Sequence, residues 1–515
     1  MRRVVVREEA ESGGDSPETQ SGSRSRGIVA VAPIVIAGIA IALANVGSTV
    51  VVARLLVPRE YGALAQLLGL FFILSMPGSA LMVGVVQRVV HWNASGENWR
   101  VKPWLVRVEL VCFAFLVLFL AAIWLLQGDI AKVLSLPNSR GVFETLAAGA
   151  LWVIVSVNRG ALQAGKNYRW LGWNLALEGV VRTAFMIGLA AIGLGILGAS
   201  SGIMIGEAAA LVHGIAGVGF SLRAARRGNG SLDGGKVPVT IPPGENGTGD
   251  TEAGEAGGLI GGMAGGLIGG FADGTGGLME RSKEGIKDRA QEDSKEGLPK
   301  VHGKSKVHGK RELVGDVATA FASLGLIAIL QYADVVMVGA YSPSHAGAYG
   351  AVSVSAKSLV AWTILLTNYL LPEAAIRWRV GGHAINELRN TMLLVILPAL
   401  LMLAIALSVP SLFLGLAFGA KLEGAASSFP YLTAAMAFLS ITVVLSSYFF
   451  GVSWRGIPAV LLAGAAVLVT AVAAVQGKPL QAAQVDFLVQ LGIAVAMGIA
   501  FVMVHRRKSS SLPSA

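Results

Sequence analysis

The sequence predicts an all-α polytopic membrane protein with about twelve transmembrane helices in two lobes of six. Hydrophobic residues make up 54% of the 515 residues, charged residues make up 14%, and the mean hydropathy is +0.65. Apolar runs of helix length recur along the chain, and one long polar segment divides them into two sets. A soluble chain this apolar could not cover its own surface, whereas a membrane-spanning helix needs about 20 apolar residues and presents them to lipid. The composition therefore excludes a soluble protein as the main body.

A window of about 19 residues locates the individual helices. The predicted spans are 27–53, 63–87, 104–127, 143–163, 170–197, 199–222, 313–340, 346–371, 390–416, 426–450, 456–476 and 484–504. They form an N-lobe over 27–222 and a C-lobe over 313–504. Pro77, Pro398 and Pro410 lie inside predicted spans, where each proline removes a backbone hydrogen bond and predicts a kink.

The segments outside the two lobes are polar. Residues 1–26 and 505–515 form tails, and the first tail is too long and too mixed in charge for a cleavable signal peptide. Residues 223–312 are rich in Gly, Lys, Glu and Asp and show no sustained apolar period. We expect this segment to be a mostly disordered linker.

The distribution of charge predicts how the chain lies in the membrane. The net charge of +10 comes from short basic clusters between apolar spans, and no nucleic-acid-binding fold accompanies it. With the N-terminus in the cytoplasm, the inside loops carry eleven Lys and Arg residues and the outside loops carry six. The positive-inside rule therefore places both termini and the linker in the cytoplasm. Cys112 is the single cysteine, which excludes a disulfide framework and a cysteine metal cluster, and we expect no cofactor.

A weak internal repeat relates the two lobes. Val50, Val51, Pro58 and Gly62 match Val335, Val336, Pro343 and Gly347 at one offset of 285 residues. Six helices separate the two copies, and because six is even, the two lobes have the same orientation in the membrane. Transporters built from such parallel repeats carry their substrate between the halves.

Several segments resemble the signatures of one transporter family. Residues 53–62, ARLLVPREYG, resemble the sequence after the first helix of Wzx-type polysaccharide flippases. Residues 159–164, RGALQA, resemble the Arg-Gly-x-x-Gln segment that closes the fourth helix of that family. The seventh and eighth helices are similar at Tyr332-Ala333-Asp334, at Gly347-Ala348-Tyr349 and at Leu371-Pro372. The resemblance covers about 27–222 and 313–504, and the long insert between the lobes departs from the family pattern.

The resemblance implies two six-helix lobes that form a V around a central cavity in the plasma membrane. It implies outward flipping of a polyprenyl-diphosphate-linked oligosaccharide by alternating access, for cell-surface polysaccharide biosynthesis. The expected partners are this lipid-linked glycan, membrane lipids, and a polysaccharide polymerase or glycosyltransferases, and we expect a monomer. The superfamily also contains multidrug and cation antiporters and the lipid II flippase, so these functions stay open as alternatives.

Charged side chains inside the predicted spans are the candidate site residues, because each costs about 2.5–3.5 kcal/mol to insert and usually faces a cavity or a partner. Glu178 and Arg182 stand four residues apart and can pair on one helix face. Arg182 and Lys357, from opposite lobes, are the candidate ligands for a diphosphate headgroup. Asp334 can pair with Lys357, bind a coupling cation or cap a bend. Further candidate acids and near-boundary bases are Glu207, Asp316, Arg54 and Arg159, and snorkelling of the two arginines to lipid phosphate is the alternative for them.

Two other classes of function compete with a flippase. A cation antiporter of the same fold predicts a mainly acidic cavity, for which Glu207, Asp316 and Asp334 are available. A membrane enzyme would need a large outer loop or a catalytic domain with clustered carboxylates. The predicted outer loops are short and the linker carries no catalytic motif, so the sequence argues against an enzyme.

Overall fold

The computed structural model describes residues 46–94, 97–165, 167–229, 305–379, 385–452 and 454–509. The regular elements of these residues are helices, which confirms the predicted all-α fold. Nine helices of the described ranges are long and apolar enough to cross a membrane, one of them the continuous run Arg169–Ser221. The first predicted span, 27–53, is described only from residue 46 onward, as the helix Val46–Leu55.

The N-lobe follows the predicted order of helices, with short connections. Its elements are α2 (Pro58–Ala94), η1 (Asn98–Arg100), α3 (Val101–Val133), α4 (Val142–Ala164), α5 (Tyr168–Leu189), η2 (Ala190–Leu194) and α6 (Gly195–Asn229). Helix α4 lies at the centre of the lobe, against α2 and α6, and 83% of an 18-residue apolar stretch of this helix is buried. In helix α3 only 11% of the corresponding stretch is buried, as expected for a helix that faces lipid.

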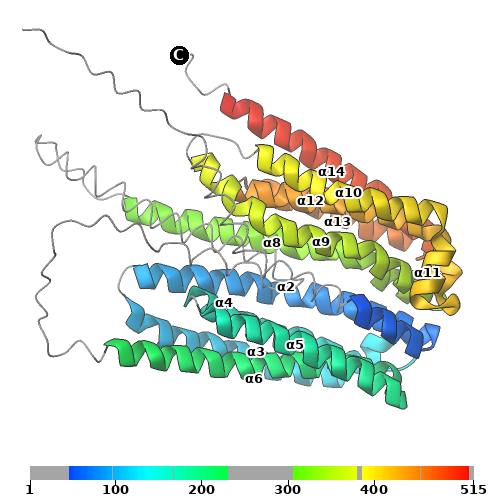
Figure 1. Cartoon of the computed structure of the whole chain (residues 1–515), viewed down its shortest axis with the longest axis horizontal. Helices are drawn as coiled ribbons and strands as arrows, with labels where there is room; N and C mark the ends of the chain where they lie inside the picture. The colour runs from blue at the N-terminus through cyan, green and yellow to red at the C-terminus, as the bar shows by residue number, and fades with distance from the viewer. Residues whose placement is uncertain are drawn as a thin grey trace, which may run out of the picture.

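The C-lobe lies beside the N-lobe, with its helices in the upper half of Figure 1. Its elements are α8 (Ser305–Tyr341), α9 (Ala346–Arg379), α10 (Ile385–Ser408), α11 (Pro410–Phe418), η5 (Ala420–Ser428), α12 (Phe429–Gly451), α13 (Ile457–Ala474) and α14 (Pro479–Ser509). Helix α12 is central, against α9 and α14, and α13 packs on α8.

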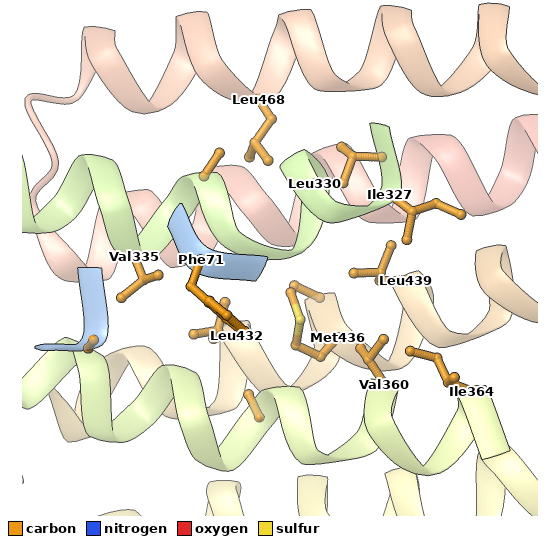
Figure 2. Packing of buried hydrophobic residues seen from close by; sticks show 14 of the residues in the cluster. Phe71, Ile327, Leu330, Val335, Val360, Ile364, Leu432, Met436, Leu439 and Leu468 are labelled. Carbon is orange, nitrogen blue, oxygen red and sulfur yellow. The ribbon is translucent and has the colours of Figure 1, made fainter. Parts of the chain in front are cut away.

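Helix α2 connects the two lobes because it packs against α4 on one side and against α8 and α9 on the other. Its Phe71 belongs to the same buried cluster as Leu432 and Met436 of α12, and Figure 2 shows the three side chains together. The apolar core of the C-lobe therefore continues into the first long helix of the N-lobe.

The structure corrects one predicted span, 390–416, and the two ends of the predicted linker. The predicted span 390–416 is two helices, because α10 ends at Ser408, Val409 has φ −141° and ψ 50°, and Pro410 starts α11. A residue before proline avoids the helical region, and proline suits the first position of a new helix. Pro77 and Pro398 stay inside the helices α2 and α10. Helices α6 and α8 extend into both ends of the predicted linker, whose residues 230–304 lie outside the described ranges.

Candidate functional site

A cavity of about 180 Å³ lies between the lobes. Helix α5 contributes Leu175, Glu178, Gly179, Arg182 and Met186, which share one face because they are spaced three or four residues apart. Helices α8 and α9 close the opposite side with a similar spacing. The lining residues of the C-lobe are Gln331, Tyr332, Val335, Gly350, Ser353, Val354, Lys357, Ala361 and Ile364. The charged residues among those that line the cavity are Arg182 and Glu178 from the N-lobe and Lys357 from the C-lobe.

Glu178 is the centre of a buried charge cluster in the N-lobe. Its Oε2 accepts from Arg159 at 2.6 Å and its Oε1 pairs with Arg182 Nη1 at 3.0 Å. The Arg159 side chain is only 3% exposed, and its Nε donates to Asn174 Oδ1 at 2.7 Å while its guanidinium lies 5.0 Å from the Trp152 ring centroid. The snorkelling interpretation of Arg159 is therefore wrong, since this side chain points into the lobe and not to lipid phosphate.

Arg182 is the member of this cluster that reaches the cavity. Its side chain is 18% exposed, whereas Arg159 and Glu178 are almost fully enclosed. The predicted pair between Glu178 and Arg182 is confirmed, and it leaves the guanidinium at the cavity wall. Arg159 supports the site from behind and does not line the cavity.

A stripe of glycines sets the position of Glu207. Gly198, Gly202 and Gly206 recur every four residues on α6, and an added Cβ at each would collide with the α5 backbone or with Arg182 Cβ. At Gly206 the collision distance to Arg182 Cβ is 2.6 Å. The close approach of α6 to α5 brings the next residue, Glu207, into the buried cluster at 0% exposure.

Lys357 and Asp334 form the matching pair in the C-lobe. Lys357 Nζ donates to Asp334 Oδ1 at 2.8 Å, and Tyr349 Oη donates to Asp334 Oδ2 at 3.1 Å. The Lys357 ammonium lies 5.0 Å from the centroid of the Tyr332 ring, which also lines the cavity. Of the three roles considered for Asp334, ion pairing with Lys357 is the one observed. Asp334 itself is fully buried behind the lysine.

Two predicted site residues lie elsewhere. Arg54 is exposed and donates from Nε to the Ala417 carbonyl at 3.0 Å and from Nη2 to the Leu416 carbonyl, at the end of α11. It therefore connects the lobes at one end and does not line the cavity. Asp316 falls within α8, but its side chain lies outside the described residues.

Sequence inspection missed several polar residues of the site. Asp486 on α14 is fully buried, accepts from Gln490 at 3.1 Å and leaves its Oδ2 without a hydrogen-bond donor in the described part of the chain. Its position inside the last predicted span was a sufficient signal, because a carboxylate there carries the same insertion cost as the others. Asn174 gave no such signal, since uncharged polar residues are common in membrane helices. Tyr349 belongs to the signature Gly347-Ala348-Tyr349, but the resemblance did not assign it to the site.

The backbones of the two lobes come into contact at the end where α2 begins, which we call the Gly62 end. An added Cβ on Gly62 would lie 2.5 Å from Gly347 N, and one on Gly347 would collide with the Pro58 carbonyl. Pro58 and Gly62 belong to one copy of the internal repeat, and Gly347 belongs to the other. The contact therefore brings the two copies of the repeat together. Glycine is required here because only a residue without Cβ permits this contact between backbones.

Neither a protein-family model nor a curated protein matches the sequence. Among solved structures, an inward-facing multidrug resistance MATE family transporter of the MOP superfamily matches with a TM-score of 0.54 at 11% identity, over 92% of this chain and 99% of that chain. The lipid II flippase MurJ in an inward closed conformation matches with a TM-score of 0.54 at 7% identity, over 91% and 87%. A MOP superfamily transporter from Pyrococcus furiosus, described as having a binding pocket of reversed polarity, matches with a TM-score of 0.53 at 13% identity, over 94% and 96%. The chain therefore has the two-lobed fold of MOP superfamily transporters and is a multi-pass membrane protein.

Proposed function

We propose that the protein is a flippase that moves a polyprenyl-diphosphate-linked oligosaccharide from the cytoplasmic to the outer leaflet by alternating access. The observation that carries this proposal is the pair of basic side chains, Arg182 and Lys357, on opposite walls of one cavity. A diphosphate that bound both side chains would contact both lobes at once, and its binding would depend on how the lobes are arranged.

The energetics of a charged headgroup support a cationic cavity. Desolvating an unpaired charge costs many kcal/mol, and basic side chains in a wet cleft replace the lost hydration. Moving two negative charges outward is favoured by roughly 4–5 kcal/mol per 100 mV when the cell interior is negative. The membrane potential can therefore drive export of such a lipid without a coupled ion.

The orientation predicted from the basic loops indicates which side of the membrane the Gly62 end faces. With both termini in the cytoplasm of a plasma membrane protein, the Gly62 end faces outward. We infer that the contact of Gly62 with Gly347 then closes the cavity on the outer side, which would make this conformation the inward-facing state. We expect this closure to open when substrate is released into the outer leaflet.

Two alternatives belong to the same fold. A multidrug or cation antiporter would need acidic side chains at the cavity, and Glu178, the carboxylate on the wall described above, is already held by Arg159 and Arg182. A lipid II-type flippase would bind the same diphosphate chemistry, and the likeness to MurJ keeps this substrate as the second candidate. A polymerase or glycosyltransferase partner and a monomeric state remain predictions from the family resemblance.

Reconstitution into liposomes tests the proposed function. With a polyprenyl-diphosphate oligosaccharide in one leaflet, we expect wild-type protein to make the sugar accessible to a glycosidase on the other side. Arg182→Gln is expected to lower the rate roughly 10- to 100-fold, because a hydrogen bond to a charged group contributes about 1.5–3 kcal/mol. Lys357→Gln combined with Asp334→Asn, which removes both members of the buried ion pair, is expected to lower the rate to a similar degree.

The matched control is Glu109→Gln on α3, which removes a charge from a transmembrane helix and does not touch the cavity. Its rate should equal that of the wild type. Movement of cationic dyes without movement of the glycolipid would reject the flippase proposal and select the antiporter.

A further inference from the structure

We propose that Glu207 is a proton-binding site and that its proton is bound together with an anionic headgroup in the adjacent cavity. This inference rests on the proposed function for the identity of the anion. The proton site itself follows from the arrangement of α4, α5 and α6.

Glu207 has no donor among the described residues to satisfy a negative charge. It is fully buried, and neither of its oxygens has a hydrogen-bond partner among the described residues. The carboxyl group of Glu178 is close enough to interact with it. Two carboxylates cannot hydrogen-bond to each other, because both are acceptors, so this contact becomes a hydrogen bond only when a proton lies between them. An ionised carboxylate buried without a donor is strongly disfavoured, which makes the neutral acid the stable form in this conformation.

The charged groups that act on Glu207 come from the helices packed against α6. They are Arg159 on α4 and Glu178 and Arg182 on α5. Helix α2 also touches α6, and its Glu60 lies against Gly195, twelve residues and about 18 Å along α6 from Glu207.

Three other basic groups, Arg59, Arg88 and His213, lie farther from the acid along their own helices. Arg59 stands next to Glu60 at the start of α2, and Arg88 lies near the far end of that helix. His213, on α6 itself, lies beyond Glu207 and contacts Asn174 and Trp170. The charge of the buried cluster is therefore decided by two guanidinium groups and two carboxyl groups.

The proton on Glu207 sets the net charge of this cluster. With Glu207 neutral, two guanidinium groups face one carboxylate, and the excess positive charge reaches the cavity through Arg182. With Glu207 ionised, the cluster is neutral, and the second carboxylate competes with a bound anion for the same guanidinium groups. Anion binding and protonation therefore favour each other. The affinity for the anion is therefore high at low pH, where Glu207 keeps its proton. It falls as the pH rises and Glu207 loses that proton.

The experiment measures binding of a short-chain prenyl-diphosphate-linked sugar to the full-length protein in lipid nanodiscs between pH 5 and pH 9. The two phosphates of this probe are diesters and do not titrate in that range. We expect the wild-type dissociation constant to rise with pH, by at most about tenfold per pH unit for one linked proton. Glu207→Gln should bind with the low-pH affinity at every pH, whereas Glu109→Gln should follow the wild type.

A second measurement is independent of the substrate. The infrared band of protonated carboxylic acids should be present in wild-type protein without ligand, and Glu207→Gln should remove one component of it. Asp486 is a second fully buried carboxyl group with an oxygen that lacks a donor among the described residues, so the Glu207 signal is read from the difference between the two spectra. Equal bands in wild type and Glu207→Gln would overturn the proton site whatever the binding data show. An equal pH dependence in wild type and Glu207→Gln would overturn the linkage and leave the proposed function intact. A Glu207 component without diphosphate binding at any pH would instead reject the proposed function and leave the proton site standing.

Discussion

Replacing Glu178 by glutamine is expected to lower the free energy of unfolding by about 3–5 kcal/mol, the usual cost of removing one partner of a buried ion pair. The loss is large because Glu178 pairs with two guanidinium groups, and Arg159 is only 3% exposed. Without the carboxylate, Arg159 keeps a hydrogen bond to Asn174 and the face of Trp152, which do not neutralise its charge. The midpoint of thermal unfolding in detergent measures the effect.

A compensating variant separates lost charge balance from lost packing. Arg159→Met together with Glu178→Gln removes the buried cation and the anion, and exchange of a buried pair for apolar or neutral groups is often nearly neutral. This double variant should therefore recover most of the lost stability. Glu109→Gln is the control for removing a carboxylate from a membrane helix. An unfolding midpoint of Glu178→Gln equal to that of the wild type would contradict the central role of Glu178 in the cluster.

Replacing Gly62 by leucine is expected to abolish transport by preventing closure of the Gly62 end. The first side-chain carbon alone would lie 2.5 Å from Gly347 N and 2.6 Å from the carbonyl carbon of Ala346. These are backbone atoms, which cannot rotate away, so the lobes must separate at this end. The protein should then accumulate in a state in which the cavity is open on the Gly62 side.

Thiol labelling measures this shift. In a Cys112→Ser background, Ser353→Cys places a reporter on the cavity wall, where the native serine is buried. A membrane-impermeant reagent added on the Gly62 side should label the reporter several-fold faster when Gly62→Leu is present. Gly84→Leu is the matched control, because an added Cβ there meets no atom of the described residues within 4 Å. Equal labelling rates with and without Gly62→Leu would contradict the assignment of this contact as the closed gate.

The sequence predicts the fold well because its signal is local. Runs of about 20 apolar residues define helices without reference to any other part of the chain. The break at Pro410 was also locally encoded, since proline restricts the residue before it. The repeat of Pro58 and Gly62 at Pro343 and Gly347 predicts two related lobes, although it does not by itself indicate that the two copies touch each other.

The candidate site depends on contacts between helices, and here the sequence predicts less. Arg182 and Lys357 could be identified from their insertion cost and their separate lobes. The burial of Arg159 could not, because its position near a predicted helix end fits a lipid-facing side chain equally well. Glu207 enters the cluster only because the glycine stripe of α6 lets that helix approach α5. No spacing within one helix indicates such a contact.

Binding of the charged headgroup to purified protein is the most direct test of the cationic cavity. A radiolabelled prenyl-diphosphate sugar and a cationic dye are titrated separately against wild-type protein and against the combined variant Arg182→Gln, Lys357→Gln, Asp334→Asn in nanodiscs. We expect the wild type to bind the diphosphate and the combined variant to bind it at least about tenfold more weakly. Tight binding of the dye in place of the diphosphate, or equal diphosphate binding by both proteins, would contradict it.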